Sequence, residues 1–177
     1  MKKYNVIYAD PPWRYKLWTG GGAADEHYPT MSIEDIKALP VDKLAAKDCA
    51  LFLWITFPML HEAWDVMRAW GFDFKTVAFV WIKLNRTADT LFWGMGHWTH
   101  ANAEICLLAT SGHPKRQAKN IHQIVISHVE EHSKKPEEVR RRIEALMGDV
   151  PRVELFARRP SLGWDVWGNE VESDLCL

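Results

Sequence analysis

Six short apolar runs, each rich in β-branched or aromatic residues, recur along this 177-residue chain. Most are apolar without interruption, which is typical of strands buried on both faces of a sheet. The predicted strands cover residues 4–9, 50–56, 77–82, 103–109, 123–127 and 152–157. Strands that alternate with helices indicate an α/β domain with a largely parallel sheet that is covered on both faces.

Three segments between these runs carry helix signals. Residues 32–39 begin at Ser32, and the run from residue 32 to residue 35 resembles a capping box. Residues 59–70 are followed by Gly71, which suits a helix stop. Residues 136–147 begin with Pro136, a residue that suits the first helical position, and Gly148 ends them. The apolar side chains expected on one face of this last helix are Val139, Ile143, Leu146 and Met147.

The order of these elements predicts a three-layer αβα sandwich, Rossmann-like, with about seven strands. The chain shows no internal repeat, low-complexity segment or linker, so we expect residues 1–177 to form one domain with a core of its own. In open sheets of this kind, ligands bind beyond the carboxyl ends of the strands. Polar residues at those ends are therefore the candidates for function.

The sequence Asp10-Pro11-Pro12-Trp13 directly follows the first predicted strand. Two prolines forbid continuation of the strand, so Asp10 is expected at its carboxyl end. A carboxylate and a nearby unpaired proline carbonyl can accept both hydrogens of an exocyclic amine, which turns the nitrogen lone pair toward a methyl donor. Trp13 offers a face on which a base can stack. The plain alternative is a turn after a strand, but the buried strand and Trp13 favour function.

The segment from Tyr8 to Trp13 resembles the catalytic motif of the MT-A70 family, the S-adenosylmethionine-dependent adenine-N(6) methyltransferases. Further segments resemble the rest of the family pattern in the same order. They lie at residues 28–32, 81–83, 94–98, 102–104, 132–138, 154–158 and 163–170. The resemblance implies a permuted order, with the catalytic loop first and the cofactor strand last. It also implies methyl transfer from S-adenosylmethionine to the N(6) amine of adenine in nucleic acid.

The resemblance also assigns residues to the site. The implied catalytic residues are Asp10, Pro11, Pro12 and Trp13. The implied cofactor contacts are Asp10, Pro11, Lys135, Glu154, Phe156, Arg158 and Asn169. Lys135 precedes a helix N-terminus, where backbone donors favour the cofactor carboxylate, and Glu154 could bond the ribose hydroxyls. A strand phenylalanine is usually core, and loop or cap roles suit Arg158 and Asn169 equally. The chain departs from the family pattern at residues 159–161, Arg159-Pro160-Ser161, and this leaves the ribose-side contacts open.

The net charge of -1 excludes a polybasic protein that binds nucleic acid through phosphate contacts alone, so a local patch must supply them. Two loops are candidates: residues 14–28, which contain Trp18 and several glycines, and the basic run at residues 113–122, which could also be a solvated loop. The predicted substrate-binding residues are Trp13, Tyr28, Lys115, Arg116 and Lys119. Asn85, Trp98 and Asn102 are weaker candidates, because such residues are more often found in turns or cores. Small size and the absence of an appended recognition domain favour DNA over RNA.

Two other functions remain open at this point. A catalytically inactive family relative could bind nucleic acid or a partner subunit, although the intact Asp10-Pro11-Pro12-Trp13 speaks against it. A zinc hydrolase is a remote alternative, because His128, Glu131 and His132 match the HxxEH signature, in which both histidines must lie on one helix. That motif follows a β-rich run, and no clear third ligand stands out. We therefore expect no metal site.

The three cysteines are far apart and form no CxxC motif, which fits unpaired thiols in a reducing compartment. The first residues lead directly into a strand-like run without a signal-peptide core, and no apolar run is long enough to span a membrane. We therefore expect a soluble, cytoplasmic protein that has no membrane contact. Its oligomeric state, monomer or homodimer, is left open.

Overall fold

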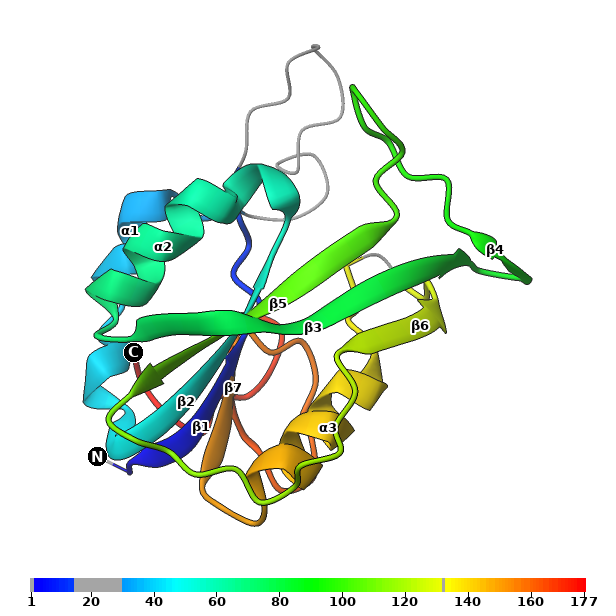
Figure 1. The fold of residues 1–177 in the computed structure, drawn as a ribbon. Coiled ribbons are helices and arrows are strands. Elements are labelled where there is room, and N and C mark those ends of the chain that lie inside the picture. Colours follow the sequence, from blue (N-terminus) through cyan, green and yellow to red (C-terminus); the bar gives the residue numbers. More distant parts are fainter. Residues whose placement is uncertain (1, 15–29, 132) are drawn as a thin grey trace.

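The computed structural model describes residues 2–14, 30–131 and 133–177, and Figure 1 shows its ribbon. Its strands are β1 (Tyr4–Ala9), β2 (Ala45–Ile55), β3 (Asp73–Asn85), β4 (Ala88–Leu91), β5 (Ala103–Ser111), β6 (Ile124–His128), β7 (Arg152–Leu155) and β8 (Asp165–Trp167). Its α-helices are α1 (Ile33–Ala38), α2 (Leu60–Ala69) and α3 (Glu137–Met147). Two 3-10 turns, η2 (Val41–Lys43) and η3 (Phe57–Met59), precede β2 and α2.

The strands form one sheet in the order β4-β3-β5-β2-β1-β7-β8, and β6 pairs with β3. Helices α1 and α2 lie on one side of the sheet and α3 on the other, as the predicted three-layer αβα sandwich requires (Figure 1). The sheet has 8 strands, close to the seven expected. The prediction of a largely parallel sheet was too simple, because β5 runs antiparallel to both β2 and β3. Parallel neighbours need a crossover connection, usually a helix. The chain instead passes from β3 to β5 through β4 and a loop, which suits an antiparallel pair.

Alternate residues of the central strands pack into two separate cores. In β2, Leu51 and Leu53 join the core beneath α1 and α2, whereas Phe52 and Trp54 join the core beneath α3. The side-chain period of two in a strand sends neighbours to opposite faces, so a continuous apolar run fits only a sheet that is covered on both sides. The uninterrupted runs in the sequence therefore identified these strands correctly.

The helix signals were also confirmed, with small shifts at the ends. Ser32 caps α1, and its hydroxyl accepts a hydrogen bond from Asp35 N at 3.1 Å. Gly71 follows α2 with a φ of 77°, a left-handed conformation that glycine adopts at little cost. Pro136 is the N-cap of α3 rather than its first residue. No helix in the described part of the chain has both the length and the apolar character needed to cross a bilayer.

The strand register brings several chain segments to one edge of the sheet. Ala9 at the end of β1 pairs with Leu53 of β2 and Leu155 of β7, and Leu155 pairs with Trp167 at the end of β8. Because β5 is antiparallel, it starts at this edge rather than ending there. Residues that follow β1 and β7 therefore lie near residues that begin β5.

Candidate active site

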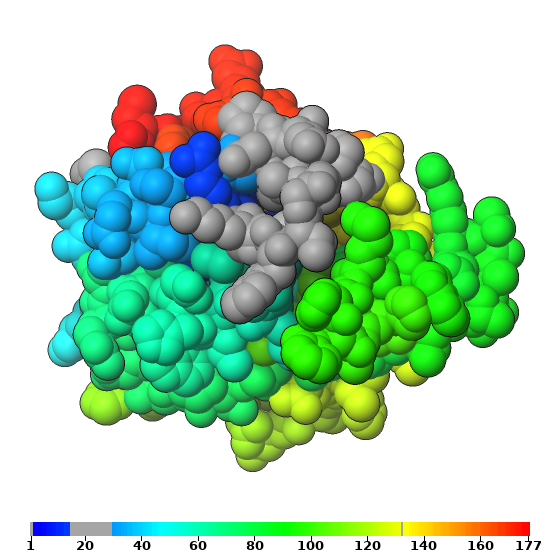
Figure 2. All heavy atoms as spheres, turned by 90° about the horizontal axis from the view of Figure 1, so that it is seen from above, coloured from blue at the N-terminus to red at the C-terminus, as the bar shows by residue number. Residues whose placement is uncertain are grey.

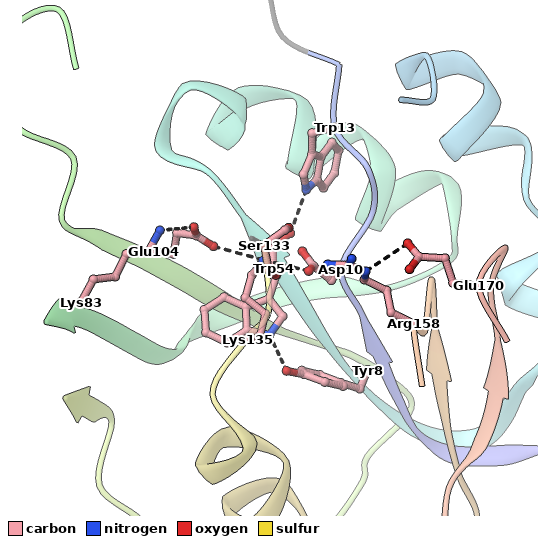
Figure 3. Close-up of polar contacts among 10 residues, drawn as sticks. All are labelled: Tyr8, Asp10, Trp13, Trp54, Lys83, Glu104, Ser133, Lys135, Arg158 and Glu170. Carbon is pink, nitrogen blue, oxygen red and sulfur yellow. Dashed lines mark hydrogen bonds and ion pairs between the residues drawn. The ribbon is translucent and has the colours of Figure 1, made fainter. Parts of the chain in front are cut away.

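Asp10 directly follows β1 and belongs to a chain of four alternating charges (Figure 3). Lys135 Nζ lies 2.7 Å from Asp10 Oδ2 and 3.3 Å from Glu104 Oε2. Lys83 forms an ion pair with the other oxygen of Glu104. The side chains of Lys135 and Glu104 are only 11% and 15% exposed, so these pairs are weakly screened by solvent. Two cations and two anions balance in this Lys83–Glu104–Lys135–Asp10 chain, hereafter the charge chain.

The environment shifts the pKa values of the two carboxyl groups of the charge chain in opposite directions. Burial raises the pKa of Asp10 above its usual value, and this effect exceeds the opposing attraction of Lys135. Burial acts on Glu104 as well, but Lys135 and Lys83 together hold the pKa of that carboxyl below its usual value. Glu104 is therefore a fixed anion, whereas Asp10 is the more basic carboxylate and the better proton acceptor.

The loop at residues 10–13 is held by hydrogen bonds. Trp13 Nε1 donates to the backbone oxygen of Trp54 at 2.9 Å, and Trp54 Nε1 donates to the Tyr8 hydroxyl at 2.6 Å (Figure 3). Burial raises the pKa of Tyr8 well above its usual value, so this hydroxyl stays neutral. Trp13 thus ties the loop to β2 and Tyr8 ties β2 back to β1.

One detail of the predicted loop chemistry was wrong, and a second is modified. Trp13 is only 4% exposed and packs in the core, although it also lines the second of the two cavities described below. The carbonyl oxygens of the two prolines are not unpaired: Pro11 O accepts from Trp13 N at 2.8 Å, and Pro12 O accepts from Met31 N at 3.0 Å. The sequence could not reveal either contact, because both depend on how the loop turns back.

Two cavities meet at Asp10. The first, about 430 Å³, lies along the start of α3 and the end of β7, and Tyr8, Pro136, Glu154 and Ser161 are among the residues that line it alone. The second, about 680 Å³, has more apolar walls, and Pro12, Trp13, Trp81, Phe92 and Trp167 are among its residues. Asp10, Lys135, Phe156 and Arg158 line both cavities. A group in one cavity can therefore face a group in the other across Asp10.

The predicted cofactor residues gather around these two cavities. Glu154 lines the first cavity, where its Oε2 accepts from Arg140 Nη2 at 2.7 Å and Nε at 3.1 Å. Arg158 pairs with Glu170 at 3.0 Å. Pro11 and Asn169 line the second cavity and not the first, whereas Glu154 lines only the first. Lys135 does not point away toward a ligand carboxylate, because its ammonium group is held by Asp10 and Glu104.

Phe156 and Ser133 line both cavities in strained backbone conformations. Each has a φ of 63°, in the left-handed region that is uncommon for residues other than glycine. Such strain costs about 1–3 kcal/mol per residue and is typical of binding sites, where the surrounding structure holds it in place. The Phe156 ring packs edge-on against Trp167 with centroids 5.3 Å apart, so it is neither buried in the core nor free.

The predicted basic patch lies at the wrong edge of the sheet. Ser111 at the end of β5 pairs with Cys49, far along β2 from Leu53, which pairs with Ala9 beside Asp10. The loop that follows crosses the bottom of Figure 1, and Gln117 N donates to Leu146 O at the end of α3. Lys115, Arg116 and Lys119 therefore lie opposite Asp10 and cannot hold a base there. The antiparallel direction of β5, which the sequence did not reveal, is the reason.

The second predicted substrate loop, residues 14–28, lies outside the described residues except for Arg14, and so does Tyr28. His132 of the HxxEH signature also lies outside them. The first histidine of this signature, His128, ends β6 rather than lying on a helix, and Glu131 forms an ion pair with Arg159. Among residues 2–14, 30–131 and 133–177, no group of three or more potential ligands is placed to hold a metal ion.

Sequence reasoning assigned no role to Lys83, Glu104 or Arg140. Lys83 and Glu104 belong to segments that fitted the family pattern, but nothing in their spacing of 21 residues indicates a contact. The available signal was chemical: a charged side chain at the end of a buried strand needs a partner. Arg140 is the first of three consecutive arginines, a pattern that by itself does not distinguish it from Arg141 and Arg142, yet its side chain is only 16% exposed.

The sequence of the chain is similar to those of known methyltransferases. A profile of the family described as MT-A70 matches residues 4–170. The chain is 35% identical over 190 residues to the Type II methyltransferase M.MunI from Mycoplasma sp, an alignment that covers 96% of this chain and 78% of the relative.

Two eukaryotic proteins are also similar. Identity is 29% to the N(6)-adenosine-methyltransferase MT-A70-like protein of Drosophila melanogaster and 26% to the N(6)-adenosine-methyltransferase catalytic subunit METTL3 of Homo sapiens. Each alignment covers 96% of this chain. The chain spans only 27% and 28% of the length of these two relatives.

Proposed function

The chain belongs to the MT-A70 family of methyltransferases, and from this premise we propose that it transfers a methyl group from S-adenosylmethionine to the exocyclic N(6) amine of adenine in nucleic acid. The observation that carries the proposal is the position of Asp10 in the wall shared by two cavities. Methyl transfer needs a donor and an acceptor that face each other across one point. DNA is the favoured substrate, and RNA is the alternative.

We assign the donor to the first cavity because its walls suit the parts of S-adenosylmethionine. The N-terminal end of α3 borders this cavity at Pro136 and Glu137, and the backbone N–H of Glu137 can face a carboxylate. Glu154 can accept hydrogen bonds from ribose hydroxyls, and Phe156 can pack against a purine. When bound, S-adenosylmethionine supplies an electrophilic methyl group on a sulfonium and leaves as a neutral thioether.

We assign the adenine to the second cavity, where flat apolar side chains accept a base. The base must leave its stack to enter, because its amine cannot be reached inside a duplex. One oxygen of Asp10 is held by Lys135, and the carboxylate accepts a hydrogen from the amine. The nitrogen lone pair then turns toward the first cavity. As the new nitrogen–carbon bond forms, the nitrogen becomes positive and releases a proton, which the raised pKa of Asp10 equips this carboxylate to receive.

We propose that the whole chain forms one methyltransferase domain and acts in the cytoplasm. The three cysteines are free thiols, and Cys49 and Cys106 are buried, which fits a reducing compartment.

The test is transfer of radiolabelled methyl groups to matched DNA and RNA oligonucleotides, followed by mass spectrometry of the digested nucleosides. We expect N(6)-methyladenine, with faster labelling of DNA. Faster labelling of RNA would reverse the substrate preference. No labelling, together with no binding of S-adenosylmethionine by calorimetry, would favour a non-catalytic relative and defeat the proposal.

A second expected result concerns Arg140. Burial raises the pKa of Glu154, and Arg140 opposes this rise. Loss of the arginine should therefore favour the neutral form of Glu154 and leave its side chain without the contact that holds it in place. The variant Arg140→Met is expected to weaken S-adenosylmethionine binding about tenfold at neutral pH, as measured by calorimetry. The variant Arg141→Met is the matched control, because Arg141 is on the same helix but 67% exposed. Equal affinities for the two variants would show that Glu154 needs no support from Arg140.

A further inference from the structure

Two of the most exposed large side chains in the described structure are tryptophans on one projecting segment. This segment, residues 86–102, is called the arm; it contains β4 and joins β3 to β5. Trp93 is 74% exposed and Trp98 is 92% exposed. The arm extends from the sheet on the same side as the end of β1 (Figure 1), and it forms part of the rim when the molecule is viewed from that side (Figure 2).

The arm is held in a defined shape near its base. Asn85 Nδ2 donates to the backbone oxygen of Leu91 at 3.0 Å and to Thr90 Oγ1 at 2.9 Å. Phe92 N donates to Lys83 O at 2.8 Å. Asn85, a weaker substrate candidate from the sequence, is therefore a residue that closes the hairpin.

The outer part of the arm folds tightly back on itself. A Cβ at Gly94 would lie 1.8 Å from Ala101 O, and one at Gly96 would lie 2.0 Å from Thr99 O. Only glycine fits so close to another stretch of backbone. The two glycines therefore permit the narrow turn that carries Trp98 at its outer end.

Each exposed tryptophan lies against a histidine. The rings of Trp93 and His100 have centroids 3.9 Å apart at an interplanar angle of 37°, and His100 Nδ1 is 3.2 Å from Gly94 O. His97 packs edge-on against Trp98 at 5.4 Å. One face of the Trp93 ring is thus supported from within the arm, which limits the entropy lost when a ligand stacks on it.

The arm continues directly from the proposed base cavity. Phe92 and Lys83 line that cavity together with Asp10, and Trp93 is the next residue after Phe92. Lys83 is also the outer member of the charge chain, two ion pairs away from Lys135. The exposed aromatic rings therefore begin where the wall of the cavity ends.

We propose that Trp93 and Trp98 form a stacking platform for the nucleotides that flank the target adenine, an inference that rests on the proposed function. An adenine drawn into the cavity leaves its neighbours unstacked at the cavity mouth. Tryptophan faces bind such bases without regard to sequence. The near-neutral charge of the chain makes stacking, rather than a dense set of phosphate contacts, the main source of affinity.

The composition of the arm favours nucleotides over a protein partner. Residues 86–102 contain one leucine, one methionine and no isoleucine or valine. The core of a protein interface is a contiguous apolar surface, whereas here the exposed Trp93, Met95 and Trp98 are separated by glycine and histidine. A protein partner, including a second copy of this chain, is the competing outcome of the test.

The test compares Trp93→Ala, Trp98→Ala and the double variant with the wild-type protein on adenine-containing single strands of increasing length, from a mononucleotide to about ten nucleotides. For wild-type protein, KM should fall as flanking nucleotides are added. Each single variant is expected to raise KM for the long strand about tenfold with little change in kcat or in S-adenosylmethionine affinity. The double variant should lose the dependence of KM on strand length. The variant Trp98→Phe, which keeps an aromatic ring, should retain much more of this dependence than Trp98→Ala.

Trp64→Ala is the matched control, because Trp64 is also exposed but packs against Phe74 and lines neither cavity. It should leave the length dependence intact. If the tryptophan variants of the arm methylate long strands as well as wild type, the platform is disproved while the proposed function stands. Light scattering that shows loss of a dimer in Trp98→Ala would also overturn it, in favour of a protein interface. Failure of the wild-type protein to methylate any strand would instead count against the proposed function.

Discussion

Replacing Asp10 with asparagine is expected to lower kcat about 10³-fold or more while leaving S-adenosylmethionine affinity within about threefold of wild type. The change keeps the size of the side chain but removes its negative charge and its capacity to take up a proton. Asp10 lies in the wall between the two cavities, and the contacts assigned to the donor at α3, Glu154 and Phe156 remain in the variant. Single-turnover methyl transfer and calorimetry on the same preparation measure the two effects.

The pH dependence of the wild-type protein provides a second measure of this role. Burial raises the pKa of Asp10, and only the ionised carboxylate can accept the amine hydrogen. The rate constant kcat should therefore fall as the pH is lowered through a value above the ordinary range for aspartate. Glu104 cannot produce this acidic limb, because its pKa is lowered. A rate that stays constant down to the ordinary range, or an Asp10→Asn variant that turns over normally, would remove Asp10 from the chemistry.

Thermal melts are the control for the Asp10→Asn variant. Lys135 keeps its second partner, Glu104, when Asp10 becomes neutral. A carboxyl whose pKa is raised in the folded state destabilises the protein once it ionises. A neutral replacement removes this destabilisation at neutral pH. We expect the free energy of unfolding to change by no more than about 1 kcal/mol. A loss of activity accompanied by unfolding would not count as support.

The second large effect is expected for Lys135→Met, which should reduce the free energy of unfolding by about 3–5 kcal/mol. Among the described residues, Lys135 is the cation that pairs with both the Asp10 and the Glu104 carboxylates, and its own side chain is 11% exposed. Methionine fills most of the same volume but leaves two nearby anions without the cation between them. Denaturant titration at neutral pH measures the change.

Lys134→Met is the matched control for this variant. Lys134 is the adjacent residue, but it pairs with Glu130 on a more exposed surface, where removal of an ion pair costs about 1 kcal/mol or less. Equal losses for the two lysines would show that the charge chain does not stabilise the fold.

The decrease in the free energy of unfolding caused by Lys135→Met should also depend on pH and on the charge of Asp10. Without the lysine, both carboxyl pKa values rise, so protonation at acidic pH should narrow the difference from wild type. The double variant Lys135→Met/Asp10→Asn should be more stable than Lys135→Met alone, because one unpaired anion has been removed. Strict additivity of the two single changes would contradict a direct interaction between them.

The charge chain explains how an acidic side chain can work at a buried site. An isolated buried carboxylate would take up a proton and lose the charge that attracts the amine. Lys135 compensates Asp10, and Glu104 with Lys83 compensates Lys135. The rigid loop at residues 10–13 then fixes the position of the carboxylate through Trp13 and Trp54.

The sequence by itself determined most of the fold. Apolar runs identified β1, β2, β3, β5, β6 and β7. The runs of β1, β2 and β5 are continuous because strands buried on both faces cannot accommodate polar residues at alternate positions. Capping and stop residues located the three α-helices. The strands β4 and β8 were missed, since β4 is exposed along its whole length and β8 has only 3 residues. Neither carries an apolar run that a sequence pattern could detect.

The position of Asp10 could also be predicted, because prolines end a strand and the carboxyl end of a strand in an open sheet faces the ligand. The tertiary structure alone decided which side chains join it. The direction of β5 brings Glu104 to Asp10 and carries Lys115, Arg116 and Lys119 to the far edge, and direction depends on pairing between distant strands. Contacts such as Lys83–Glu104, Arg140–Glu154 and Trp13–Trp54 are likewise set by register and packing, which local sequence patterns do not encode.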